Sequence, residues 1–223
     1  MSNNVAKFAA LLVITPLIAA GCSSGGGGGD TTPPASLPPT STPAASETVT
    51  AAEAKATLIT VQDVGPGFTT AQFQPSADPL PCKPNDPPLE EQFPSTLEVG
   101  AAFLRNGAAL GEDLRYYADV STASQVLTLA AAGLNCPSGK LNFTGKPVTV
   151  QFGNLQDITS AVGADKAIAI QATAPTYFIV LIGCQVGRED VLFSFLRTKS
   201  TPTSSLPNPV TIVRTAVQKI KNS

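Results

Sequence analysis

Apolar residues recur at every second position in several runs of this chain, and that period of two limits the fold more than any other feature. Residues 99–103 form the first such run and residues 114–120 form the second. Alternation of this kind is typical of half-buried strands in an antiparallel sheet. A glycine-bearing link at residues 106–111 joins the two runs, so they are predicted to form a hairpin.

Further strands are predicted before and after this hairpin. The segment 177–186 is apolar on both faces, as expected of a central strand that is covered on both sides. A turn at residues 187–190 leads to a returning strand. The predicted strands outside the first hairpin are residues 68–74, 148–152, 168–172, 177–186 and 191–196.

Three helices are predicted from apolar periodicity and from capping residues. The first begins at Thr50 in a capping box with Glu53 and ends before the Gly-Pro-Gly at residues 65–67. The second covers residues 122–134, with Thr122 as its cap, and the third begins at Asn208. The fold class is therefore α+β, a single mainly antiparallel sheet covered by helices on at least one face, and residues 50–223 are long enough to be one domain.

The first residues have the pattern of a bacterial lipoprotein signal peptide. An apolar run of thirteen residues follows Lys7, too short to cross a bilayer as a helix, and Ala-Gly precedes Cys22. This ending resembles the lipobox of bacterial lipoproteins, in which the cysteine receives a diacylglyceryl group and becomes the mature N-terminus. Residues 1–21 are therefore predicted to be a signal peptide and Cys22 a lipid anchor, with an ordinary secretory signal as the alternative.

A linker rich in glycine, serine, threonine and proline is predicted over residues 22–49. It has too few apolar side chains to offset the entropy of ordering, so it is expected to be a disordered tether. The predicted location is thus the extracytoplasmic face of the cell membrane, where the protein is held by its lipid.

Composition excludes several functions for the predicted domain, residues 50–223, which is 174 residues long. The 223-residue chain contains no histidine, which excludes Ser-His-Asp and Cys-His catalytic sites and histidine metal sites. Its formal net charge is −2, which gives no footprint for nucleic acid. No cofactor, no metal and no enzymatic activity are therefore expected.

Three cysteines follow Cys22, and one disulfide is expected in an oxidising compartment. Cys82 and Cys136 both lie beside prolines in predicted loops, and their pairing is favoured. It would tie the proline-rich segment 75–97 to the end of the second helix. The alternative pairing is Cys136 with Cys184, but Cys184 lies in an apolar strand and is expected to be a buried free thiol.

The layout of residues 50–223 resembles the extracellular sensor domain of PknH-type serine/threonine kinases from high-GC Gram-positive bacteria. This resemblance implies a role in sensing or binding a small molecule at the cell surface, and it implies no catalytic residue. The residues that carry it are Asp63–Phe68, Pro81-Cys82, Ala101–Phe103, Tyr117–Asp119 and the hairpin 178–195, while Phe68 departs from the tryptophan frequent in that family.

The candidate binding residues are aromatic. Tyr116, Tyr177 and Phe178, together with Tyr117, are candidates for lining a ligand pocket, although each also suits a sheet core. Ser194 has no histidine to activate it.

The doublets Glu112-Asp113 and Glu189-Asp190 are expected to be solvated near turns. Neighbours on a strand also point to opposite faces, which makes each doublet a poor catalytic pair. A cleft with converging carboxylates of strongly shifted pKa would instead favour an enzyme.

The predicted function is therefore a membrane-anchored, non-catalytic lipoprotein that binds an unknown small molecule or lipid. The alternative is a carrier of lipid or glycolipid in the cell envelope, because the two-faced apolar run from Phe178 to Val186 could border a cavity.

Overall fold

The computed structural model describes residues 49–75, 77–143, 146–202 and 206–223. Residues 49–223 form one compact unit. The predicted signal peptide, the anchor Cys22 and the predicted linker up to residue 48 lie outside the described residues. No helix within the described ranges is long and apolar enough to cross a membrane.

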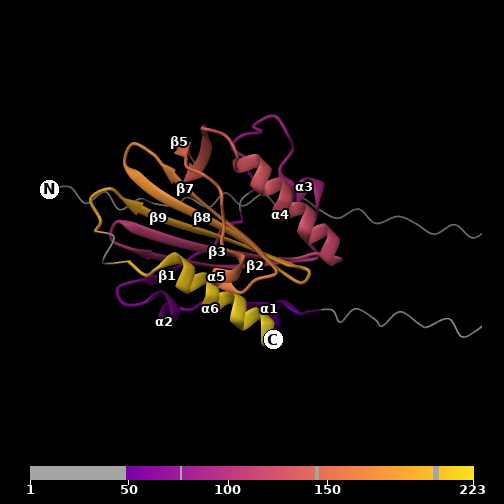
Figure 1. The fold of residues 1–223 in the computed structure, drawn as a ribbon. Helices are drawn as coiled ribbons and strands as arrows, with labels where there is room; N and C mark the ends of the chain where they lie inside the picture. Colours follow the sequence, from indigo (N-terminus) through magenta and orange to yellow (C-terminus); the bar gives the residue numbers. More distant parts are fainter. Residues whose placement is uncertain (1–48, 76, 144–145, 203–205) are drawn as a thin grey trace, which may run out of the picture. The chain divides into compact units, whose positions relative to one another are not determined.

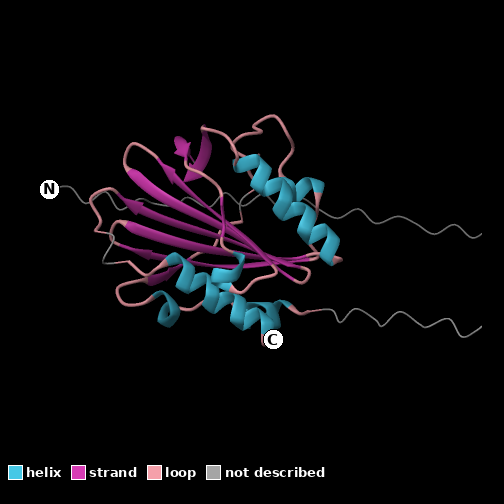
Figure 2. Ribbon diagram, viewed as in Figure 1, coloured by secondary structure: helices cyan, strands magenta, loops and turns pink. Residues whose placement is uncertain are grey.

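A single sheet runs through the domain, with helices on both faces (Figures 1 and 2). The strand order is β1-β2-β3-β9-β8-β7-β5-β4, with β6 beside β7, and every pair is antiparallel. The described strands are β1 (Thr69–Ala71), β2 (Leu97–Arg105), β3 (Ala108–Tyr116), β4 (Ser138–Phe143), β5 (Lys146–Phe152), β6 (Gln156–Asp157), β7 (Lys166–Thr173), β8 (Tyr177–Val186) and β9 (Glu189–Thr198). The predicted α+β class and antiparallel sheet are confirmed.

The helices divide between the two faces of the sheet. Helices α1, α2, α5 and α6 pack on one face, which we call the α6 face, and α4 lies on the other, which we call the α4 face (Figure 1). Short α3 lies near α4. The described helices are α1 (Ala51–Thr57), α2 (Val61–Val64), α3 (Leu89–Gln92), α4 (Val120–Leu134), α5 (Thr159–Val162) and α6 (Pro209–Lys221).

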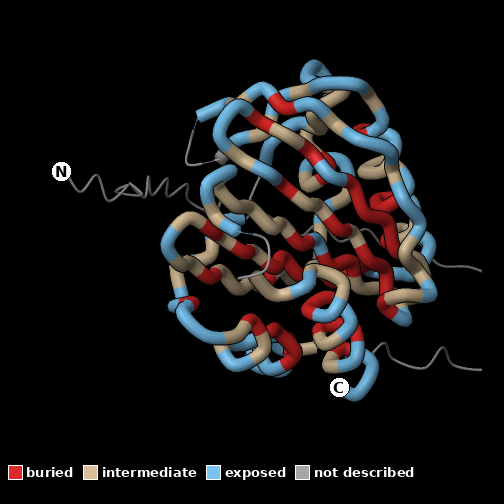
Figure 3. The backbone as a smooth tube through the Cα atoms, turned by 60° about the vertical axis from the view of Figure 1, so that its left-hand side comes forward, coloured by how far each residue is buried: buried red, intermediate tan, exposed pale blue. Residues whose placement is uncertain are grey.

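The main core lies between α6 and the sheet, and buried positions follow the strands through the interior (Figure 3). Ile212, Val213 and Val217 of α6 face Leu114 and Phe193, which are fully or almost fully buried. Burying side chains of this size stabilises the fold by about 1.5–3 kcal/mol each. The apolar residues at every second position of β3 and β9 are therefore those that face α6.

The first helix differs from the prediction because the sequence contains two capping boxes. Thr50 and Glu53 cap α1, and Thr60 and Asp63 cap a separate helix, α2. Residues 58–60 separate the two helices, and Leu58 is extended with ψ 154°, so one continuous helix is not formed. Glu112 on β3 binds this break, because its Oε2 accepts a hydrogen bond of 2.8 Å from the Ile59 amide.

The start of α4 also differs from the prediction. Asp119 caps it and accepts a 2.8 Å hydrogen bond from the Thr122 amide, so the helix includes Val120 instead of beginning at Thr122. Strand β3 accordingly ends at Tyr116. The cap of α6 at Asn208 is confirmed.

The hairpin between β2 and β3 is tighter than predicted. Its turn is Asn106-Gly107, and residue 108 already pairs with Arg105. Gly107 has φ +75°, which L side chains rarely adopt, and a Cβ there would lie 2.2 Å from the Thr201 hydroxyl. Strand pairing therefore extends to residues 108–111, which the sequence assigned to the link.

Four short elements were not predicted, namely β4, β6, α3 and α5. Each has at most six residues, and none shows a full period of alternation. The longer strands β5, β7, β8 and β9 are confirmed, while β1 covers only residues 69–71 of the predicted strand.

Residues 77–96 connect β1 to β2 and pass over the α4 face; we call them the cover segment. A disulfide joins Cys82 of this segment to Cys136 just after α4, with a Cα–Cα distance of 5.8 Å. The Cys82 amide also donates to the Gly133 carbonyl at 3.0 Å. The favoured pairing is thus present, and Cys184 is free and buried.

Replacing both Cys82 and Cys136 with serine is expected to lower the free energy of unfolding by about 2–4 kcal/mol, because the bridge closes a loop with a sequence separation of 54. Urea denaturation with and without reductant measures this effect. Cys184→Ala is the matched control, since it removes a cysteine outside the bridge and should leave the response to reductant intact. A wild-type protein indifferent to reductant would contradict the prediction.

Candidate functional site

A cavity of about 760 Å³ lies between the α4 face of the sheet, α4 and the cover segment. Leu181, Leu192 and Ser194 contribute to its floor, and Leu127 and Leu134 of α4 form a wall. Leu192 lies on the central strand β9, and its side chain is nevertheless 45% exposed. Solvent therefore reaches this part of the sheet through the cavity. The volume falls in the range of small-molecule sites.

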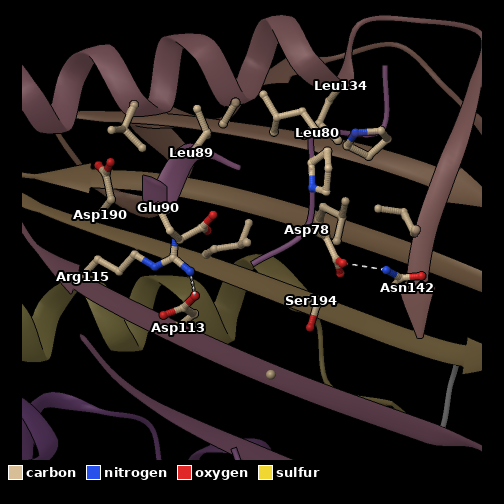
Figure 4. Close-up of a pocket in the computed structure, with 18 of the residues that line it drawn as sticks. Asp78, Leu80, Leu89, Glu90, Asp113, Arg115, Leu134, Asn142, Asp190 and Ser194 are labelled. Carbon is tan, nitrogen blue, oxygen red and sulfur yellow. Dashed lines mark hydrogen bonds and ion pairs between the residues drawn. The ribbon is translucent and has the colours of Figure 1, made fainter. Parts of the chain in front are cut away.

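Small residues bring the walls of the cavity together. A Cβ on Gly133 of α4 would lie 2.4 Å from Leu80, and a Cβ on Gly139 would lie 2.7 Å from the Pro81 carbonyl. The cover segment therefore approaches α4 and β4 closely on either side of the disulfide. At the same end, the Asn142 amide donates a 2.6 Å hydrogen bond to Asp78 (Figure 4).

Arg115 organises the opposite, polar end of the cavity (Figure 4). Its guanidinium, only 11% exposed, forms ion pairs with Asp113 at 2.7 Å and with Glu98 at 3.0 Å, and it also contacts Glu90 of α3. Burial alone disfavours the charge, but these carboxylates outweigh it and raise the pKa of Arg115. The ion pairs thus connect two strands to the cover segment.

Asp190 lines the polar end of the cavity as well, but it forms no ion pair or hydrogen bond of this kind among the described residues. It is 9% exposed, and neither carboxylate oxygen has a hydrogen-bond partner among the described residues. Burial raises the pKa of Asp190 to about 8, against the opposing effect of the Arg115 charge. Across the strands, Asp190 pairs in register with Arg115, so both side chains stand on the α4 face.

Asp113 and Glu90 are each bound through one oxygen only. Asp113 Oδ1 and Glu90 Oε2 are buried and without a hydrogen-bond partner in the part of the chain that the structure describes. Burial raises the pKa of Asp113 despite the nearby Arg115. The expectation that the carboxylate doublets are solvated is therefore wrong for Asp113 and Asp190, because α4 and the cover segment close over this face.

The doublets do split across the sheet, as strand alternation requires. Glu112 points to the α6 face, where it is fully buried, and burial raises its pKa to about 8. Asp113 points to the cavity instead. The Glu112 carboxylate is thus a structural ligand of the Ile59 amide, on the other face of the sheet from the Asp113 carboxylate.

The aromatic residues proposed for a pocket are dispersed. Tyr116 is buried in the α6-side core, and Tyr177 packs in a smaller cluster at the other end of the sheet. Phe178 borders a second cavity of about 570 Å³ on the α6 face, with the Arg197 guanidinium 4.2 Å from its ring centroid. The structure does not bring the three together at either cavity, and Tyr117 is the tyrosine that lines the larger one.

Sequence reasoning missed Arg115, Glu90 and Asp190 as site residues. One signal was available, namely that Asp113, Arg115 and Tyr117 alternate and so share a face. Polar alternation on a strand normally marks a solvated face, and nothing local shows that a helix covers it. Within the described ranges, no three His, Cys, Asp or Glu side chains are grouped so as to hold a metal ion.

Comparison with known proteins identifies the fold. The chain is similar to the extracellular domain of PknH from Mycobacterium tuberculosis, with a TM-score of 0.58 and 11% identity over 76% of this chain and 95% of that one. A putative uncharacterized protein from Mycobacterium smegmatis is matched at a TM-score of 0.33 and 9% identity, over 72% of this chain and 92% of that one. No protein-family model and no curated protein matches. The fold expected from the resemblance is therefore confirmed.

Asp190→Asn is expected to flatten the pH dependence of stability. The carboxyl has a pKa of about 8 in the folded protein and about 3.9 in the unfolded chain, so stability is lost as pH rises between these values. From pH 5 to pH 8 the variant should gain at least about 1.4 kcal/mol relative to wild type, which corresponds to one pKa unit. Glu112 acts in the same direction, so the slope is reduced and not abolished.

Urea unfolding at several pH values measures this slope. The control is Asp119→Asn, because hydrogen bonds from Ser121 and Thr122 lower the pKa of Asp119. That substitution should shift stability by the same amount at pH 5 and pH 8. Equal slopes for wild type and Asp190→Asn would show that Asp190 is ionised in the folded protein at pH 5.

Proposed function

We propose that this chain is an extracytoplasmic lipoprotein whose domain binds a small molecule in the larger cavity and performs no chemistry on it. The observation that supports this most directly is the cavity itself, about 760 Å³ in volume and bordered by leucines from the cover segment, α4 and the sheet. A pocket that is largely apolar with a few convergent polar groups is the usual form of a small-molecule site.

The way the cavity is closed also supports binding. The cover segment is held at one end by the Cys82–Cys136 disulfide and at the other by the contact of Glu90 with Arg115. A preformed site avoids the entropic cost of ordering a loop around its ligand. The cavity is therefore suited to retaining a molecule of defined shape.

The extracytoplasmic location rests on the sequence. The Ala-Gly-Cys ending at Cys22 resembles a lipobox, and two acyl chains give stable membrane attachment where one is marginal. The similar solved structure is itself an extracellular domain. The linker that follows Cys22 would hold the binding domain away from the membrane surface.

Acid–base catalysis is a second candidate function, favoured by one observation. Asp113 and Asp190 line one cavity with raised pKa values, which is the pattern that acid–base enzymes use. A carrier of lipid or glycolipid differs from the main proposal only in its ligand. Native mass spectrometry of the purified protein separates these functions, since a carrier retains an intact lipid and an enzyme releases an altered molecule.

Cys22→Ala is expected to move the protein from the membrane fraction to the soluble fraction, because it removes the acceptor of the lipid. Fractionation and immunoblotting of cells measure the distribution. Cys184→Ala is the matched control and should stay with the membrane. If the Cys22 variant remains in the membrane fraction, the lipid anchor is refuted.

Leu192→Trp is expected to reduce the retained small molecule at least tenfold, because the larger side chain occupies the cavity floor. Native mass spectrometry compares the bound fraction in the variant and in wild type. Val120→Trp is the control, since Val120 is also exposed, at 56%, and does not line the cavity. Equal retention in all three proteins would place binding elsewhere.

A further inference from the structure

The polar end of the larger cavity has an excess of acidic side chains over basic ones. Glu90, Glu98, Asp113 and Asp190 gather around Arg115, which is the only cation among them. Four acidic side chains thus share one guanidinium. The described residues of this cavity also include Lys140, which lies in β4 among the residues of the opposite end.

Acceptors at this end remain unused. Both oxygens of Asp190, Oδ1 of Asp113 and Oε2 of Glu90 are buried without a hydrogen-bond partner among the residues described. Asp190 is 9% exposed and stands beside the cavity, below α4 (Figure 4). Buried polar groups are normally satisfied, and a buried carboxylate without a partner is costly.

Most of the remaining lining of the cavity is apolar. Leu89 of the cover segment lies beside this polar end, and Leu80 and Leu134 lie toward the opposite end, near Asp78 and Asn142 (Figure 4). A molecule bound here therefore meets leucine side chains along its body and unpaired carboxylate oxygens at one end. Aliphatic contacts favour an apolar body, and hydrogen bonds between a cation and a carboxylate are the strong ones.

We infer that the ligand is an organic cation with an apolar body, whose ammonium or guanidinium head donates hydrogen bonds to Asp190 and Asp113. This inference rests on the proposed function, since it names the class of molecule that the cavity binds. A bare metal ion is not the ligand, because the described acidic side chains do not form a group able to coordinate one. The head group needs directional donors, which an alkylammonium supplies.

Three water-soluble probes with the same eight-carbon chain test this. Octylammonium, octan-1-ol and octanoate are titrated into the full chain at pH 8, and binding is measured by isothermal titration calorimetry. Octylammonium is expected to bind at least tenfold more tightly than octan-1-ol, and octanoate more weakly than both. Cation–carboxylate pairing predicts this order, and long-range attraction to the protein's net charge of −2 predicts the same order, so two variants separate these two effects.

Asp190→Asn should lower octylammonium affinity at least fivefold and leave octan-1-ol affinity unchanged. Glu189→Gln is the matched control, because it removes a carboxyl group one residue away, where the side chain points to the α6 face. That control should bind octylammonium like wild type. Equal loss in both variants would mean that only long-range charge acts, and the inference would be overturned.

Failure of this inference is distinguishable from failure of the proposed function. If octan-1-ol binds as tightly as octylammonium, the cavity binds ligands but the cationic class is wrong. If no probe binds and Leu192→Trp leaves the retained molecule unchanged, the cavity is not a binding site and both proposals fall.

Discussion

Arg115 is the side chain on which the architecture of the α4 face depends. A guanidinium at 11% exposure requires carboxylate partners, and Arg115 obtains them from its own strand, from β2 and from α3. The contact with Glu90 fixes the far end of the cover segment, while the Cys82–Cys136 disulfide fixes the near end. The segment between these two attachments is therefore stretched across the sheet, and the cavity is the space that it encloses.

This arrangement accepts a cost in stability. Asp190 is buried without a hydrogen-bond partner in the described part of the protein, and burial raises its pKa. Replacing such a group by a neutral one of similar shape often stabilises a fold. Groups of this kind are concentrated at functional sites, where an unsatisfied acceptor is available for a ligand. Glu112 on the α6 face shows the contrast, because one of its oxygens is used by the Ile59 amide to hold the break between two helices.

The two faces of β3 and β9 were unequally predictable. On the α6 face, the apolar character of Leu114 and Phe193 predicts their burial, and helix α6 has a matching apolar stripe. On the α4 face, Asp113, Arg115 and Asp190 have the chemistry of a solvated surface. Their burial depends on α4 and on residues distant in sequence, such as Glu90, which lies 25 positions from Arg115, so no local pattern shows it. The aromatic residues chosen as pocket candidates were a poor guide, since aromatic side chains serve the core equally well.

The sequence by itself determined the elements whose cause is local. Alternation over five to seven residues indicated several of the long strands, and a run that is apolar on both faces indicated β8. Asn208 with the following proline specified the start of α6, and prolines beside Cys82 and Cys136 placed both cysteines in loops. Tertiary structure decided which face of the sheet would be solvated and which would become a cavity. The physical reason is that side-chain alternation assigns residues to two faces but does not say what packs on each. That choice belongs to contacts between α4, the cover segment and the sheet, and it turns polar strand positions into a buried site.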